Sequence, residues 1–179
     1  KSKYESARPP RILSAEGLLM VWTWVVLGIT IMTFNGIVIR MRKRLRWHEI
    51  MATIFFALFV EVLVDTYASF KYKAWGFFKP DAAEFSALFI ILGIYPAAAA
   101  MIINWYPYRS VWWKKGLYLL AWAVFSTSYE WLTLKVGIMW HHQWSLVHSF
   151  FLYPAIYYML IVYVRFYRWL GLKGPPAES

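Results

Sequence analysis

The 179-residue chain contains no cysteine and few charged residues. The lack of cysteine excludes disulfide bonds, thiolate metal sites and thiol-based redox chemistry. Only 16% of the residues are charged and 61% are hydrophobic, whereas a soluble domain has about 25% charged and about 45–50% apolar residues. One buried core cannot take up so large an apolar surplus in a chain of this size. The composition therefore predicts a membrane protein.

Five apolar runs are long enough to cross the hydrocarbon core of a bilayer, about 30 Å thick, as helices rising 1.5 Å per residue. The expected helices cover residues 17–39, 50–70, 83–103, 116–140 and 146–163. The predicted fold class is all-α, a polytopic transmembrane helical bundle that forms a single domain over 17–170. Residues 1–16 are expected to be irregular, and 171–179 to form a loose tail.

Two prolines fall inside the predicted helices. Tyr95-Pro96 interrupts the third run and Tyr153-Pro154 the fifth. Proline lacks the amide proton of a helical hydrogen bond and its ring crowds the preceding turn, so both helices are expected to be kinked.

The basic residues indicate membrane topology rather than nucleic-acid binding. The net charge is +10, but Lys and Arg flank the apolar runs, as the positive-inside rule describes. Counted over the loops, they favour an N-terminus outside and a C-terminus inside. The densest cluster, a candidate site for anionic lipid headgroups, comprises Arg40, Arg42, Lys43, Arg44 and Arg46. Membrane lipids are the expected partners, together with other membrane subunits or a second copy of the chain.

Aromatic residues make up 21% of the chain. Trp and Tyr concentrate at the headgroup level of bilayers, so most are expected to form interfacial belts and lipid contacts. The alternative is that part of them lines a pocket for an apolar ligand.

Four ionisable residues in the apolar runs are the candidate site: Glu61, Asp65, Glu130 and His148. Such residues are costly in lipid and suggest a function by default. Glu61 and Asp65 are four residues apart, on one face of a helix. Two interpretations stay open. The acids either bind a cation or carry protons, or they pair with Lys71, Lys73 or Lys135 and hold the bundle together.

Histidines are the candidate metal ligands. His141, His142 and His148 are expected near one side of the membrane, but the sequence has no HExxH-type spacing. His48 is expected on the opposite side, so one subunit cannot supply two axial histidines to a haem. No cofactor is predicted.

A short motif recurs in the third and fifth runs. Tyr95-Pro96-Ala97 and Tyr153-Pro154-Ala155 occupy similar places, and the run before each carries Glu61 or Glu130. If these pairs of helices are parallel repeats, the two glutamates face each other across a pseudo-two-fold axis, as transporter sites do.

From His48 onward, over roughly two-thirds of its length, the chain resembles a family of uncharacterised small multi-pass membrane proteins of spore-forming Gram-positive bacteria. The resemblance implies a bacterial cytoplasmic membrane and no particular activity. It rests on His48-Glu49, Ala52-Thr53, Phe56-Ala57, Asp65, Lys71-Tyr72, Gly93-Ile94-Tyr95-Pro96, Asn104, Tyr106-Pro107, Lys115, Leu117-Tyr118, Ala121-Trp122, Tyr129-Glu130-Trp131-Leu132, Leu134-Lys135, Gly137, Trp144 and Tyr153-Pro154.

Three functions fit these observations. The chain carries no nucleotide-binding loop or hydrolase motif, which favours a non-enzymatic accessory or structural subunit, or a small binding protein, of a membrane assembly. The second hypothesis is a small transporter or an ion- or proton-conducting protein centred on Glu61, Asp65 and Glu130. The third is a membrane-embedded, metal-dependent enzyme that uses the same acids with His148.

Overall fold

The computed structural model describes residues 15–78 and 85–173 and is mostly helical. The helices are α1 (Ala15–Arg40), α2 (Trp47–Thr66), α3 (Ala87–Gly93), α4 (Tyr95–Trp105), α5 (Trp112–Lys135) and α6 (Leu146–Lys173). A π-helical turn, η1 (Tyr67–Lys71), follows α2, and two short strands are β1 (Trp75–Phe77) and β2 (Met139–His141).

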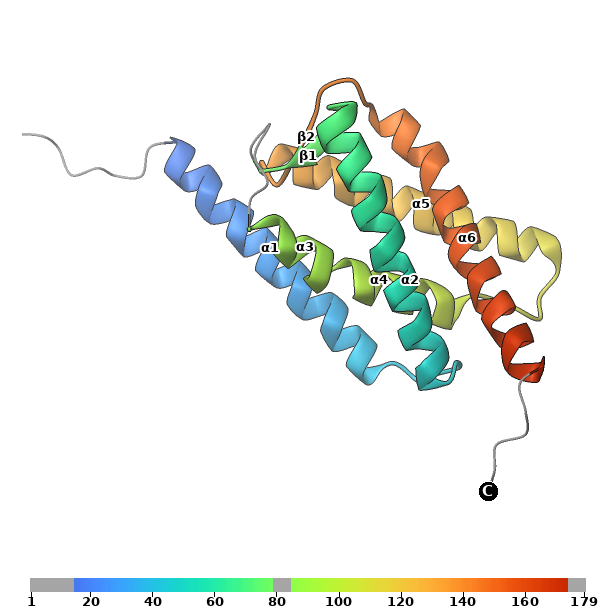
Figure 1. Ribbon diagram of the computed structural model, residues 1–179. Coiled ribbons are helices and arrows are strands. Elements are labelled where there is room, and N and C mark those ends of the chain that lie inside the picture. The colour runs from blue at the N-terminus through green and yellow to red at the C-terminus, as the bar shows by residue number, and fades with distance from the viewer. Residues whose placement is uncertain (1–14, 79–84, 174–179) are drawn as a thin grey trace, which may run out of the picture.

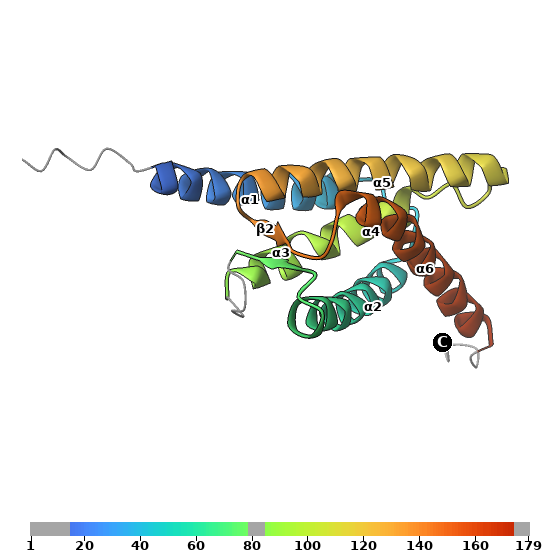
Figure 2. The same ribbon diagram turned by 90° about the horizontal axis from the view of Figure 1, so that it is seen from above.

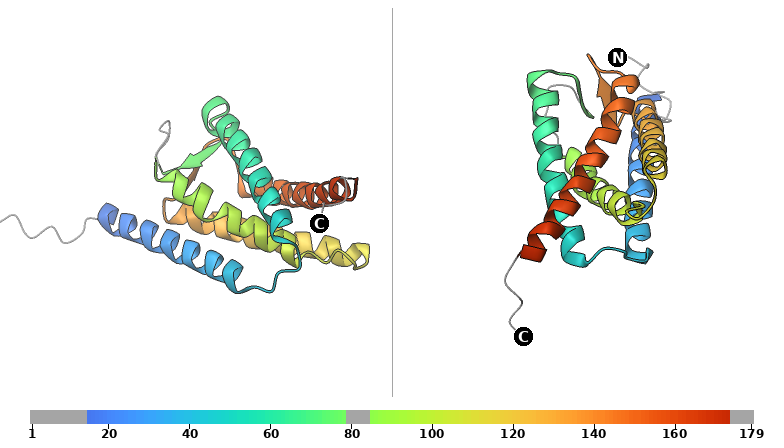
Figure 3. Two further views of the ribbon diagram at one scale, coloured as in Figure 1. Left: turned by 60° about the horizontal axis from the view of Figure 1, so that its bottom comes forward. Right: turned by 90° about the vertical axis from the view of Figure 1, so that its right-hand side faces the viewer.

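The long segments run from the upper left of Figure 1, where α1 begins and the strands lie, towards the lower right, where α6 ends. Seen from above, α1 and α5 form one layer, while α2 and the end of α6 lie on the opposite side of α4 (Figure 2). The two views in Figure 3 agree that α3 and α4 lie between α2 and the α1–α5 layer. The third predicted helix therefore forms the centre of the bundle.

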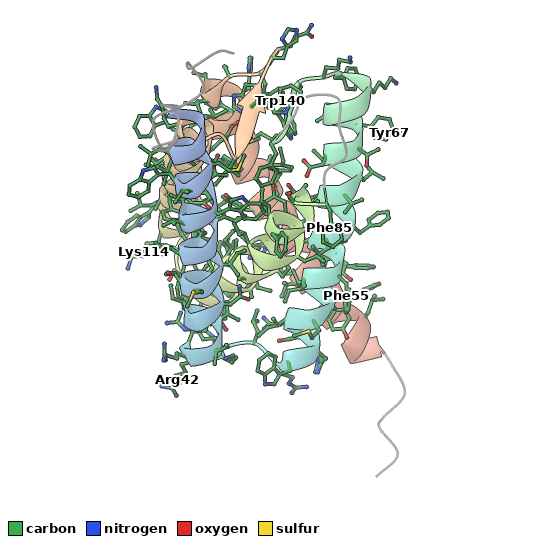
Figure 4. The ribbon with its side chains drawn as sticks, turned by 90° about the vertical axis from the view of Figure 1, so that its left-hand side faces the viewer. Arg42, Phe55, Tyr67, Phe85, Lys114 and Trp140 are labelled. Carbon is green, nitrogen blue, oxygen red and sulfur yellow. The ribbon has the colours of Figure 1, made fainter. Side chains whose placement is uncertain are left out.

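Four segments of the described residues are long and apolar enough to cross a membrane. They are Met20–Arg40, Trp47–Thr66, Ala87–Trp105 and Leu146–Gly171. Large apolar side chains cover their outer surface; Phe55 (70% exposed) on α2 and Tyr67 (52% exposed) at the start of η1, for example, project outward (Figure 4). Lipid would cover such a surface. These features support the predicted helical membrane protein.

The third predicted helix is interrupted. Helix α3 ends at Gly93 and α4 begins at Tyr95, with Pro96 in its first turn, where a missing amide proton costs little. The Gly93 carbonyl at the end of α3 accepts a hydrogen bond of 2.8 Å from Asn35 Nδ2 of α1. Helix α6, in contrast, continues through Pro154.

The helical bundle contains two short strands that the sequence did not predict. β1 pairs with β2 in antiparallel fashion, with Trp75 opposite His141 and Gly76 opposite Trp140. The fourth predicted helix was expected to reach residue 140, but α5 ends at Lys135 because Gly137 adopts a positive φ of 74°, a common way to end a helix. Other bounds differ as well: α2 begins at Trp47, α5 begins at Trp112, and α6 continues past residue 163 to Lys173.

An ion pair joins the start of α2 to the end of α6. Arg168 Nε donates to Glu49 Oε1 at 2.6 Å, and its Nη2 donates to Oε2 at 3.2 Å. The same Glu49 accepts the Arg46 amide at 2.8 Å, the half of a capping box in which the glutamate of the first turn binds the backbone amide before the helix. This contact and the strand pair hold opposite ends of the bundle.

Candidate functional site

A cavity of about 190 Å³ lies inside the bundle, between α2, α4, α5 and α6. We call it the bundle cavity. Its walls are mostly apolar and aromatic, with Phe34, Trp75, Trp122 and Trp144 among the lining residues. The polar groups that line it come from four helices and include Glu61, Tyr95, Ser126, Tyr129, Glu130, Thr133, Ser149, Tyr153 and Tyr157.

Glu130 is bound by two hydroxyl groups of α6. Its side chain is only 3% exposed. Ser149 Oγ donates to Oε1 and Tyr153 OH donates to Oε2, both at 2.6 Å. Ser149 in turn accepts a hydrogen bond of 2.8 Å from Trp144 Nε1. A buried carboxyl group is tolerated only when such donors replace water, so this network fixes the position of Glu130 on the wall of the cavity.

Glu61 lies on another wall of the same cavity, beside the side chain of Tyr95, the first residue of α4. Asp65 follows one turn later on α2 but does not line the cavity. It accepts a hydrogen bond of 3.1 Å from Trp75 Nε1. Its Oδ2 is buried and has no hydrogen-bond partner among the described residues.

The two glutamates have matching partners. The tyrosine of the first Tyr-Pro-Ala segment, Tyr95, lies beside Glu61, and the tyrosine of the second, Tyr153, donates a hydrogen bond to Glu130. In each case the tyrosine belongs to the span that follows the glutamate. The strands β1 and β2 occupy corresponding connections, one after α2 and one after α5. The repeated motif of the sequence is thus a repeated acid–tyrosine pair at one cavity.

His141 is the histidine that reaches this site. It lies on β2, and its Nε2 is 2.9 Å from Glu130 Oε1, at an angle outside hydrogen-bonding geometry. Burial lowers the pKa of His141, although the neighbouring Glu130 carboxyl group acts in the opposite direction. Burial therefore favours the neutral ring. The strand pair also brings the rings of Trp75 and Trp144 to a centroid distance of 4.6 Å beside the cavity.

The other candidate histidines lie outside the site. His142 and His148 are exposed, and His148 Nδ1 is 2.9 Å from Ser145 Oγ. Over residues 15–78 and 85–173, no three His, Asp or Glu side chains form a group that could hold a metal ion. Of the three histidines in the metal hypothesis, His141 is the one that contacts an acid of the cavity.

Two of the three lysines that might have paired with Glu61 or Asp65 lie over aromatic rings. Lys71 is 5.7 Å from the ring centroid of Tyr67, and Lys135 is 5.8 Å from that of Trp131. Such contacts are cation–π interactions. The group found against Glu61, a tyrosine hydroxyl, differs from the predicted lysine partner.

Sequence reasoning missed the partners of the acids. The tyrosines of the Tyr-Pro-Ala segments were visible as a recurring motif, but the motif did not reveal that Tyr95 lies beside Glu61 and that Tyr153 donates to Glu130. Trp75 and Trp144 were expected at the lipid interface with the other aromatics, and they line the cavity instead. Ser149 gave no signal, since a serine in an apolar helix is common.

Comparison with protein-family profiles gives no match, and no curated protein and no solved structure matches the chain. The resemblance to a family of bacterial membrane proteins therefore stays a prediction. The geometry of the bundle cavity is the basis for the proposed function.

Proposed function

We propose that the protein is a five-span membrane protein that binds a small organic cation in the bundle cavity, between Glu61 and Glu130. The observation that carries the proposal is that two glutamates from different helices, α2 and α5, line one cavity with mostly apolar walls. Carboxyl groups in such surroundings are costly unless they hold a proton, a cation or hydrogen-bond donors. Two of them at one cavity provide a binding site for positive charge.

The proposed topology counts α5 as a span. Its 24 residues extend about 36 Å, enough to cross the hydrocarbon core, and its Trp, Tyr, Ser and Thr side chains lower its hydropathy. With five spans, the cluster Arg40–Arg46 and the end of α6 lie on the same side of the membrane. The Lys and Arg distribution places this side inside, in the cytoplasmic membrane of a bacterium if the family resemblance holds.

The size and lining of the cavity support an organic ammonium ion as the ligand. An engineered cavity of about 150 Å³ binds benzene, so a cavity of about 190 Å³ suits a ligand of that size or slightly larger. Aromatic faces attract ammonium groups, and Trp75, Trp122, Trp144 and Tyr95 all line the cavity. A calcium ion, in contrast, takes about six to eight oxygen ligands.

The contacts of the two glutamates suggest how a cation could bind. The Tyr153 hydroxyl donates to Glu130, and Tyr95 lies beside Glu61. An ammonium group between the carboxylates would take the place of a proton or of these hydroxyl contacts. Binding is the step that the cavity supports directly; transport requires, in addition, that the cavity open to each side in turn.

Binding of benzylammonium to the purified protein in nanodiscs tests the proposal. Calorimetric titration is expected to show binding that weakens at least about tenfold, roughly 1.4 kcal/mol, in E61Q and in E130Q. The matched control is D65N, which removes an acid one turn from Glu61 that does not line the cavity, and its effect should be smaller. Unchanged affinity in the folded E61Q/E130Q double variant would contradict the proposal.

The accessory-subunit hypothesis stays a prediction. The exposed apolar side chains of α1 and α2 fit lipid and a protein partner equally well. Extraction under mild conditions, followed by identification of co-purifying chains, shows whether lipid or a protein partner covers this surface. A stoichiometric partner would support a subunit role, and it would not by itself contradict ligand binding in the cavity.

A further inference from the structure

The five basic residues between α1 and α2 have different surroundings. Lys43 Nζ donates to the carbonyls of Val38 (2.6 Å) and Ile39 (3.0 Å), and so caps the end of α1. The four arginines of the cluster are exposed. Three of them, Arg40, Arg42 and Arg44, line a groove that Arg46 does not line. The positive charge of this groove is therefore that of three arginines.

These three arginines line one groove. Its volume is about 670 Å³, and its remaining walls include Met32 and Gly36 on α1 and Trp105 at the end of α4. Met32 is 76% exposed and Trp105 36% exposed. The groove is not filled at Gly36, which has no side chain. A Cβ added at this position would have one neighbour within 4 Å, Arg40 Nη1 at 3.9 Å. One part of the groove is thus cationic and another part, along α1, is apolar.

The loop that carries two of the arginines is fixed from below. Asn104 of α4 is fully buried, at 0% exposure. It accepts the Arg44 amide at 2.7 Å and donates from Nδ2 to the Arg42 carbonyl at 3.0 Å. Met41, next in the loop, is buried in the core. A backbone held in this way loses little conformational freedom when a ligand binds, so the groove is preorganised.

We infer that this arginine groove binds one anionic phospholipid. Guanidinium groups bind phosphate oxygens in a bidentate manner, so the three arginines fit the headgroup phosphate. The apolar part of the groove along α1, over Met32 and Gly36, fits the first carbons of an acyl chain. The lining contains no acidic residue. Arg42 lies at the lower end of the molecule in Figure 4, where a spanning helix would meet the headgroups.

A charge-matched pair of variants tests the site. Native mass spectrometry of the detergent-solubilised protein, titrated with phosphatidylglycerol, should show one retained lipid per chain. The triple variant R40Q/R42Q/R44Q is expected to weaken this binding at least about tenfold, whereas R109Q/K114Q/K115Q, which removes equal charge before α5 and in its first turn, should change it less than about twofold. Equal loss in both variants, or equal retention of phosphatidylcholine by the unaltered protein, would overturn the inference.

A second variant distinguishes a lipid from a soluble phosphate. G36L adds an apolar side chain to the floor of the groove and leaves its charge intact; a Cβ at this position meets only Arg40 Nη1, at an ordinary contact distance of 3.9 Å. It is expected to weaken binding of phosphatidylglycerol several-fold. Inorganic phosphate at millimolar concentration should not displace the lipid from the unaltered protein. Displacement by phosphate, together with unchanged lipid binding in G36L, would show a phosphate site instead.

Discussion

Glu130 depends on hydroxyl donors from a neighbouring helix. With 3% of its side chain exposed, it has no bulk water to replace a lost partner. Tyr153 and Ser149 each donate to one carboxyl oxygen. Loss of either hydroxyl would leave a buried carboxyl oxygen without a hydrogen-bond donor. Removal of one hydroxyl group by substitution tests how much such a bond contributes to the stability of the protein.

Tyr153→Phe should lower the melting temperature of the protein in detergent, because Glu130 Oε2 loses its donor while the ring remains. A buried acceptor left without a partner costs about 1–3 kcal/mol. Tyr158→Phe is the matched control, since Tyr158 lies on the same helix and is 54% exposed; its melting temperature should stay near that of the unaltered protein. Equal melting temperatures for both variants would argue against the hydrogen bond.

His141 should make the stability of the protein depend on pH. Burial lowers the pKa of His141 below its ordinary value of 6.5, so just below pH 6.5 the unfolded chain binds a proton that the folded protein does not. Stability is therefore expected to fall as the pH drops through this window. Thermal unfolding between pH 7.5 and pH 5.5, about one unit on either side of the ordinary histidine pKa, measures the effect.

The His141→Gln variant should lose part of this pH dependence. His142→Gln provides the control at the adjacent position, because His142 is exposed and its substitution should leave the profile unchanged. Identical profiles for all three proteins would show that His141 does not carry the effect.

At the residue scale, the sequence identified the acids and not what they bind. A carboxyl group inside an apolar run is conspicuous, and Glu61, Asp65 and Glu130 are all buried or partly buried in the bundle. Which side of each helix faces the cavity could not be derived, because runs apolar on all sides carry no periodic signal of rotation. For the same reason, His148 was expected at the site, and it is exposed at the surface.

At the scale of elements, the strand pair depends on a close approach between Gly76 and Trp140. A Cβ at Gly76 would lie 2.6 Å from Cζ2 of the Trp140 ring, closer than packed carbon atoms can come. The indole of Trp140, labelled in Figure 4, therefore occupies the space that the missing side chain leaves. This contact explains why β1 contains a glycine.

Gly76→Ala is expected to destabilise the protein by about 1–3 kcal/mol, the range for overpacking. Adding Trp140→Ala should recover part of this loss, because the two side chains then no longer compete for space. A double-mutant cycle on thermal stability measures the coupling. Additive effects of the two substitutions would contradict a direct clash.

The helices were more predictable than the connections between them. Long apolar runs determine that a helix forms, and each predicted run overlaps a helix of the structure. The strands were missed because each is only three residues long and pairs with a distant segment, which local pattern cannot show. The end of α6 was missed because its last turns carry Arg165 and Arg168, and a helix that leaves the apolar core can continue with a polar face.

For the whole molecule, the proposed five-span topology can be tested by cysteine labelling, because the chain has no cysteine of its own. Single cysteines at Arg42, Arg109 and His142 replace exposed side chains in three connections. In intact cells, an impermeant maleimide should label His142→Cys and leave Arg42→Cys and Arg109→Cys unlabelled until the membrane is opened. Labelling of Arg109→Cys together with His142→Cys would show that α5 does not cross the membrane.

The strand pair also bears on how the chain is made. β1 lies between α2 and α3, whereas β2 follows α5, so their hydrogen bonds join segments separated by most of the bundle. A membrane protein is synthesised from its N-terminus, and β1 has no strand to pair with until α5 has been inserted. The end of the cavity near Trp75 and His141 is therefore completed late in biogenesis. A chain truncated after α4 would present an unpaired β1 to the quality-control machinery of the membrane.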